Sequence, residues 1–143
     1  MIRVTVPGKI MIAGEYHILR GGEAVAATVD HAVTLEASPA AAEDKGVTVD
    51  ATPFWDRERT LNDQCSPHDP VWGPLLTFQQ GGYGVPEKIR ITSDLGVGGL
   101  GSSSALRLGL CTLLTAFQQQ RAPNSLVLDE GTTDQLIKRA WQL

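Results

Sequence analysis

The chain has 143 residues, of which 12 are basic and 16 acidic, and its net charge is −4 at pH 7. Its length is typical of one globular domain, and its acidic balance argues against nucleic acid as a partner. No apolar run reaches the roughly 18 residues that a transmembrane helix needs, and no signal-peptide hydrophobic region is present. We therefore expect a cytoplasmic protein that makes no membrane contact. Cys65 and Cys111 have neither metal-ligand spacing nor the pattern of a disulfide framework.

The N-terminal half reads as a series of strands. Residues 2–6 and 10–13 are apolar and flank Pro7-Gly8, which is a turn signal. Further strands are predicted over 23–29, 31–37 and 47–51. Residues 52–70 are rich in Pro, Asp, Asn and Arg, so we expect an irregular segment that reaches toward a substrate site.

The C-terminal half alternates helix and strand. A short helix is predicted around Leu75, Leu76 and Phe78, and Gly81-Gly82 closes it. Residues 88–93 alternate in polarity and predict a half-buried strand. A long helix is expected over 102–119, a linker over 121–125 and a last helix over 133–143. The order of elements indicates an α+β fold with one domain over 1–143.

The most informative segment joins the last predicted strand to the long helix. Gly98, Gly99, Leu100, Gly101, Ser102, Ser103 and Ser104 precede the apolar helix directly. Glycines let a backbone approach an anion, and a helix N-terminus presents free N–H groups and a favourable dipole. Three hydroxyls add donors and ligands for a metal that accompanies a nucleotide. The segment predicts a phosphate site, most simply for ATP.

Other glycine-rich segments fit less well. The P-loop pattern needs a Lys after its second Gly, which is missing here. Residues 96–101 match the dinucleotide pattern G-x-G-x-x-G, but Asp129 is the only acidic candidate and follows a Pro-Asn break instead of a second strand. A flexible Gly/Ser linker has no reason to lead into a buried helix.

A second informative segment runs from Pro7 to Gly22. Lys9 opens a short apolar strand that Gly14 ends, and Glu15, Tyr16 and His17 follow. A lysine at one end of a strand and a carboxylate at the other suit a site for an anionic substrate. Taken singly, each of these residues is also compatible with a solvated surface position.

The two segments together resemble the GHMP kinase superfamily. The resemblance lies in Pro-Gly-Lys-Ile-x-Ile-x-Gly-Glu-Tyr near the start and in Gly-Leu-Gly-Ser-Ser-Ser-Ala downstream, and it covers residues 4–30 and 89–117. It is nearest to the mevalonate and phosphomevalonate kinases. It implies the ribosomal protein S5 domain 2-like fold of their N-terminal domain, with ATP and Mg²⁺ as cofactors.

The resemblance also implies roles for individual residues. The glycine segment 98–104 would hold the ATP phosphates, and Ser103 would help to hold Mg²⁺. Lys9 would act near the transferred phosphoryl group, while Glu15, Tyr16 and His17 would line the substrate side. Gly96 and Ser104 depart mildly from the family, which often has Pro and Ala there.

A larger departure concerns the C-terminal end. Family members carry a later Gly-Ser-Gly-x-Asp-type stretch, whose Asp is the catalytic base, and then a second domain; this sequence contains neither. We therefore expect the N-terminal part of a kinase, with the second domain absent and no kinase activity from the chain alone. A natural half-length protein with a partner chain, or a homodimer, is the alternative.

The sequence does not identify the substrate that would accept the phosphoryl group. Mevalonate, phosphomevalonate or a sugar fits the motifs, and the expected partner is a small molecule. From another class, a non-catalytic nucleotide-binding module is compatible with the same residues.

Overall fold

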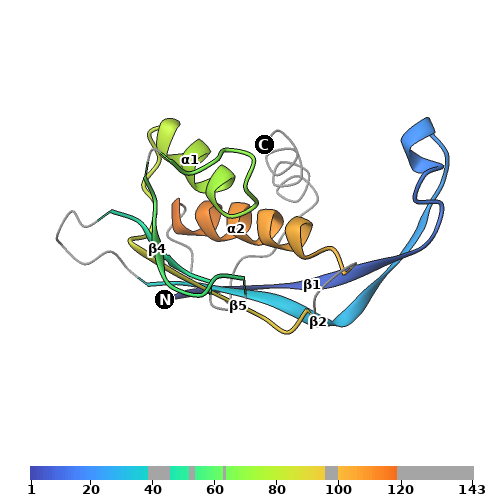
Figure 1. The fold of residues 1–143 in the computed structure, drawn as a ribbon, viewed down its shortest axis with the longest axis horizontal. Helices are drawn as coiled ribbons and strands as arrows, with labels where there is room; N and C mark the ends of the chain where they lie inside the picture. Colours follow the sequence, from blue (N-terminus) through green and yellow to red (C-terminus); the bar gives the residue numbers. More distant parts are fainter. Residues whose placement is uncertain (39–45, 52–53, 63, 96–99, 119–143) are drawn as a thin grey trace.

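The computed structural model describes residues 1–38, 46–51, 54–62, 64–95 and 100–118. These residues form one five-stranded mixed sheet, and α1 and α2 both lie on the same face of it (Figure 1). The elements in chain order are β1 (Ile2–Ala13), the 3₁₀ helix η1 (Ile18–Arg20), β2 (Val25–Ala37), β3 (Thr48–Asp50), β4 (Arg59–Thr60), α1 (Trp72–Gln80), β5 (Lys88–Ser93) and α2 (Ser102–Gln118). The predicted α+β class is confirmed.

The sheet has the strand order β1-β2-β5-β3-β4. Strand β2 pairs antiparallel with both β1 and β5, whereas β3 runs parallel to β5. Along β2 the side chains alternate, because successive residues of a strand point to opposite faces. Val33 and Leu35 are fully buried under the helices, while Thr34 and Glu36 stay partly exposed on the other face.

The predicted break at Pro7-Gly8 is wrong. Strand β1 continues through it, and only the register shifts: Pro7 pairs with Ala32 and Lys9 with Thr28, so Gly8 faces residues 29–31 of β2. Pairing along β2 overrides the local turn signal, and a proline is tolerated because β1 is an edge strand. For the same reason the two strands expected over 23–29 and 31–37 form one irregular strand.

The other predicted elements within the described residues are confirmed. The strand over 88–93, the helix that begins at residue 102 and the short helix before Gly81 all occur. Gly81 donates its N–H to the Thr77 carbonyl, and Gly82 has φ +73°, which ends α1. Among its described residues, the segment expected to be irregular contains the two-residue strand β4 and no helix. The linker and last helix predicted over 121–143 lie outside the described residues.

The core fills the space between the sheet and the two helices. Its largest fully buried aliphatic side chains come from both layers and are Leu35, Leu75, Ile89, Ile91, Leu110, Leu113 and Leu114. Helix α2 lies close to the sheet at Gly109, where an added Cβ would be 3.3 Å from Val6 Cγ2 and in steric conflict with Leu35. The glycine therefore sets the distance between α2 and the β1–β2 pair.

A side chain at this contact should weaken the fold. We expect Gly109→Val to lower the free energy of unfolding by about 2 kcal/mol, because overpacking a filled core forces neighbours from their positions. Urea unfolding followed by circular dichroism measures it. Gly84→Val is the control, since the nearest atom to a Cβ at Gly84 is 3.8 Å away. Equal losses in both variants would contradict the close packing.

Candidate functional site

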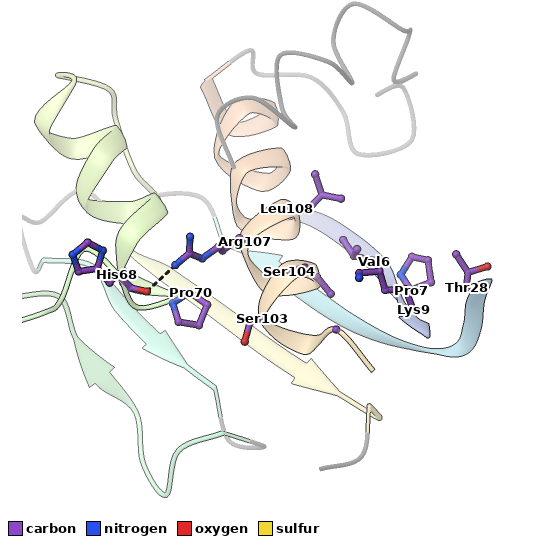
Figure 2. Close-up of a pocket in the computed structure, with 12 residues that line it drawn as sticks. Val6, Pro7, Lys9, Thr28, His68, Pro70, Ser103, Ser104, Arg107 and Leu108 are labelled. Carbon is purple, nitrogen blue, oxygen red and sulfur yellow. Dashed lines mark hydrogen bonds between the residues drawn. The ribbon is translucent and has the colours of Figure 1, made fainter. Parts of the chain in front are cut away.

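A cavity of about 650 Å³ lies where four parts of the chain meet. They are the first two turns of α2, the middle of β1, β2 at Thr28, and the segment that precedes α1 (Figure 2). The lining residues are Val6, Pro7, Lys9, Thr28, His68, Pro70, Gly101, Ser103, Ser104, Ala105, Arg107 and Leu108. Its volume is in the range of small-molecule sites.

The N-terminus of α2 opens into this cavity. Gly101 has φ +71°, and its carbonyl accepts the Ala105 N–H at 3.0 Å, so the helix starts immediately after it. Ser103 and Ser104 are exposed in the first turn and line the cavity. The first N–H groups of a helix have no partner within the helix. The 17 residues of α2 thus present backbone donors, two hydroxyls and the positive end of a helix dipole at one place.

Lys9 holds the start of α2 against β1. Its backbone N–H donates to the Leu100 carbonyl at 3.0 Å. Its side chain runs alongside Gly101, where a Cβ would be 3.0 Å from Lys9 Cγ and 3.5 Å from Lys9 Cε. A residue other than glycine at 101 would therefore be strained by its positive φ and would also crowd the lysine. The position of Lys9 is therefore fixed relative to the start of α2.

Gly8 brings the two ends of the β5–α2 connection together. A Cβ at Gly8 would be 3.0 Å from the Leu100 carbonyl oxygen and would overlap the Leu95 side chain. Leu95 precedes the segment 96–99, and Leu100 follows it. The Pro7-Gly8 pair, predicted as a turn, instead provides a place of close approach.

The cavity is basic. Lys9 and Arg107 line it, and none of the described lining residues is acidic. The Arg107 guanidinium donates to the His68 carbonyl at 2.7 Å and joins α2 to the segment before α1, as Figure 2 shows. This charge distribution suits an anionic ligand.

The structure brings together part of the predicted site. Lys9, Leu100 and Gly101 are in mutual contact, and Ser103 and Ser104 share the cavity with Lys9. Ser102 begins α2 but does not line the cavity. Gly98 and Gly99 lie outside the described residues, so their predicted role stays a prediction.

Of the lining residues that were not predicted, two can carry a charge, Arg107 and His68. Arg107 stands four residues after Ser103 on α2, so helical periodicity places both on neighbouring turns, and this spacing could have indicated it. His68 belongs to the segment 52–70, which was expected to reach toward a substrate site, but no sequence pattern distinguishes His68 within that segment.

Glu15, Tyr16 and His17 lie elsewhere. Beyond the edge of the helix layer, the β1–β2 pair continues as an arm that ends at η1 (Figure 1). The three residues are exposed in the turn at its end, and none lines the cavity. Their predicted contact with substrate stays a prediction.

A second cavity, of about 690 Å³, lies beside the segment 57–72. Its lining is mainly polar and includes Trp72, which stacks on Trp55 with ring centroids 5.1 Å apart. The Arg59 guanidinium lies 4.8 Å from the centroid of the Trp55 ring. These contacts order the segment before α1, from which His68 and Pro70 reach the first cavity.

Neither a metal cluster nor a membrane span occurs in the described part of the chain. No group of three or more His, Cys, Asp or Glu side chains is arranged to hold a metal ion there. Among the same residues, no helix is both long and apolar enough to cross a bilayer. At the first cavity the hydroxyl oxygens of Thr28, Ser103 and Ser104 are side-chain atoms of the kind that suits Mg²⁺.

Asp94, at the end of β5, has a perturbed carboxyl. The Ala32 N–H donates to Asp94 Oδ1 at 2.5 Å, and this bond lowers the pKa of Asp94 below its ordinary value. His31 Nδ1 lies 3.4 Å from the other carboxylate oxygen and lowers the pKa further.

Within the described residues, a mixed sheet with two helices on one face defines an α+β fold, and a glycine-led helix start lies beside a lysine at its candidate site. The described fold is similar to that of solved small-molecule kinases. No protein-family model matches the sequence, and no curated protein matches it significantly.

Three solved structures illustrate the similarity. The chain matches Methanococcus jannaschii mevalonate kinase with a TM-score of 0.68 and 17% identity, covering 99% of this chain and 45% of that one. It matches Streptococcus pneumoniae phosphomevalonate kinase, in complex with phosphomevalonate and AMPPNP, with a TM-score of 0.65 and 19% identity, covering 98% of this chain and 41% of that one. It matches Lactococcus lactis galactokinase complexed with galactose with a TM-score of 0.63 and 20% identity, covering 99% of this chain and 37% of that one.

The chain therefore has the fold of part of the GHMP kinases, and the predicted resemblance is confirmed at the level of the fold. It spans less than half the length of each of these kinases. At these identities the comparison establishes the arrangement of strands and helices, while the chemistry has to be argued from the cavity.

The lowered pKa of Asp94 makes the stability depend on pH. A carboxyl with a depressed pKa in the fold stabilises it above its unfolded pKa of about 3.9, and this contribution is lost as the pH falls through the lower folded value. We expect the advantage of the wild type over Asp94→Asn to shrink as the pH falls from about 5 toward 3. Urea unfolding at fixed ionic strength measures both proteins at each pH. A difference that does not change with pH contradicts the assignment.

Proposed function

We propose that the chain is the ATP-binding N-terminal part of a GHMP-type small-molecule kinase, with a ribosomal protein S5 domain 2-like fold. The observation that carries the proposal is the start of α2, where Gly101 and two serine hydroxyls face Lys9 in a cavity without described acidic residues. The structural neighbours support it, because they are kinases and one of them is in complex with AMPPNP.

The residues at the cavity fit a nucleotide phosphate group. Because Gly101 has no Cβ, the Lys9 side chain can run alongside the backbone at the start of α2. We assign the first N–H groups of α2 and residues 98–101 to the phosphates, and the Ser103 hydroxyl to Mg²⁺. The Lys9 ammonium stabilises negative charge on the transferred group. ATP supplies the phosphoryl group, and the acceptor is an alcohol or a phosphate.

The acidic groups of such a reaction are not among the described residues that line the cavity. Phosphoryl transfer needs a base or a positioning carboxylate for the acceptor. We propose that a further part of the kinase supplies it, because the neighbouring kinases are more than twice as long as this chain. The 143 residues alone are then expected to bind nucleotide without turning it over.

Mevalonate is the acceptor that we propose first, with phosphomevalonate or a sugar as alternatives. Two of the structural neighbours are mevalonate kinases, and others include a phosphomevalonate kinase and a galactokinase. Glu15, Tyr16 and His17 stay assigned to the substrate side, at the end of the β1–β2 arm.

A non-catalytic nucleotide-binding module is the second candidate. The same lack of an acidic group in the described lining favours it. A phosphoryl-transfer assay on a longer chain containing these residues separates the two functions, because only a kinase consumes ATP when the acceptor is added.

Nucleotide binding tests the proposal directly. Isothermal titration of the chain with AMPPNP and Mg²⁺ should give one site. Gly101→Ala should weaken binding by about tenfold, because the new methyl group crowds Lys9 and costs 1–3 kcal/mol at the site. Gly82→Ala is the matched control: its φ is +73°, like the +71° of Gly101, but no atom lies within 4 Å of the added Cβ. Absence of binding to the wild type, or equal losses in both variants, refutes the proposed site.

The charge of Lys9 gives an independent test. Lys9→Met should weaken AMPPNP binding about tenfold or more, since a charge-assisted bond is worth roughly 1.5–3 kcal/mol. The loss should diminish at high salt, where charges are screened. Lys88→Met serves as the control, because Lys88 forms an exposed ion pair with Glu58 at 2.8 Å and does not line the cavity. If the two variants bind equally well, Lys9 has no part in the site.

A further inference from the structure

We propose that Asp94 is a positioning residue for the nucleotide site: it fixes the end of β5 to the irregular part of β2, and through Leu95 and Gly8 it sets the position of Lys9 and the start of α2. This inference rests on the proposed function. The sequence motifs and the comparisons give Asp94 no role.

The first step is the contact between Asp94 and β2. The β2–β5 pairing ends at Val33 and Ser93, and Asp94 is the next residue. The Asp94 N–H donates to the Ala32 carbonyl at 3.2 Å, while the Asp94 carboxylate accepts the Ala32 N–H at 2.5 Å. The side chain thus satisfies a backbone donor at the point where the strand pairing stops.

This contact occurs at the irregularity that faces Gly8. Ala32 pairs with Pro7 on β1, and residues 29–31 of β2 stand opposite Gly8. His31 Nδ1, within these residues, lies 3.4 Å from the second carboxylate oxygen of Asp94. One carboxylate therefore contacts two consecutive residues of β2 and holds its irregular segment beside the end of β5.

The second step leads from Asp94 to Gly8. Leu95 is only 8% exposed, and its N–H donates to the Ser93 hydroxyl at 3.1 Å. Its side chain occupies the space that a side chain at Gly8 would fill. The direction in which the chain leaves β5 at Asp94 decides whether Leu95 reaches this space.

The third step leads from Gly8 to the cavity. Lys9 follows Gly8, donates to the Leu100 carbonyl and runs alongside Gly101. Each step from Asp94 to Gly101 thus links described residues that are either consecutive in the chain or in contact in the fold. Asp94 itself does not line the cavity, so it acts on a ligand through Lys9 and Gly101 only.

An ionised carboxylate is well suited to accept the Ala32 N–H at the end of β5. Asp94 is exposed, so its carboxylate keeps access to water while it orders the backbone of β2. The lowered pKa of Asp94 indicates that the bond from Ala32 favours the charged form. An uncharged side chain with an oxygen in the same place keeps the geometry, whereas a methyl group loses it.

Three variants test the proposal by titration with AMPPNP and Mg²⁺ at pH 7. We expect Asp94→Ala to weaken binding by about tenfold, which is roughly 1.4 kcal/mol. Asp94→Asn should bind within about threefold of the wild type, because its amide oxygen still accepts the Ala32 N–H. Glu36→Ala is the control: it removes an acidic side chain that pairs with Arg3 near one end of the β1–β2 pair, whereas Asp94 contacts the middle of that pair. Its affinity should stay within about twofold of the wild type.

The outcomes distinguish this inference from the proposed function. If the wild type does not bind, the proposed function fails. If it binds and Asp94→Ala binds equally well, or if Asp94→Asn loses as much affinity as Asp94→Ala, the positioning role is refuted. Should Asp94→Ala not fold, Asp94→Glu decides: its carboxylate is displaced by one methylene, and undiminished affinity overturns the inference.

Discussion

The close approach of β1 to both ends of the β5–α2 connection is the constraint on which the site depends. Gly8 leaves space for the Leu95 side chain and the Leu100 carbonyl, and the next residue, Lys9, bonds to that carbonyl. A Cβ at Gly8 would separate β1 from α2 and displace Lys9 from the helix start. The absence of a side chain at Gly8 thus lets the strand and the start of the helix come close together, beside the cavity that Lys9 and Gly101 line.

The layered fold explains why the site has its charge and shape. Gly109 brings α2 close to β1 and β2, so the start of the helix reaches the middle of β1. Arg107 then faces the segment before α1, which the stacking of Trp55 on Trp72 orders. Packing of apolar side chains sets the distance between α2 and the sheet. The positions of the polar groups at the cavity follow from that packing.

Local sequence patterns were sufficient to predict those strands and helices whose formation depends mainly on their own residues. The alternation over 88–93 and the apolar period after Gly101 predicted β5 and α2, because burial on one face requires that spacing. The break at Pro7-Gly8 was predicted wrongly, since pairing with β2 is a long-range interaction that a turn signal does not contain. His68 was missed for the same reason: its place beside α2 comes from the packing of the segment before α1.

The sequence by itself determined the chemistry that is local in the chain: a glycine-led helix start with three serines, and a lysine after Pro-Gly. Only the tertiary structure decided which of these groups meet. It joined Lys9 to Leu100 and Gly101, which are 91 and 92 residues away along the chain, and it put Glu15, Tyr16 and His17 at the end of the β1–β2 arm. The physical reason is that contacts between distant residues depend on strand register and on the packing of helices against a sheet, which no short segment encodes alone.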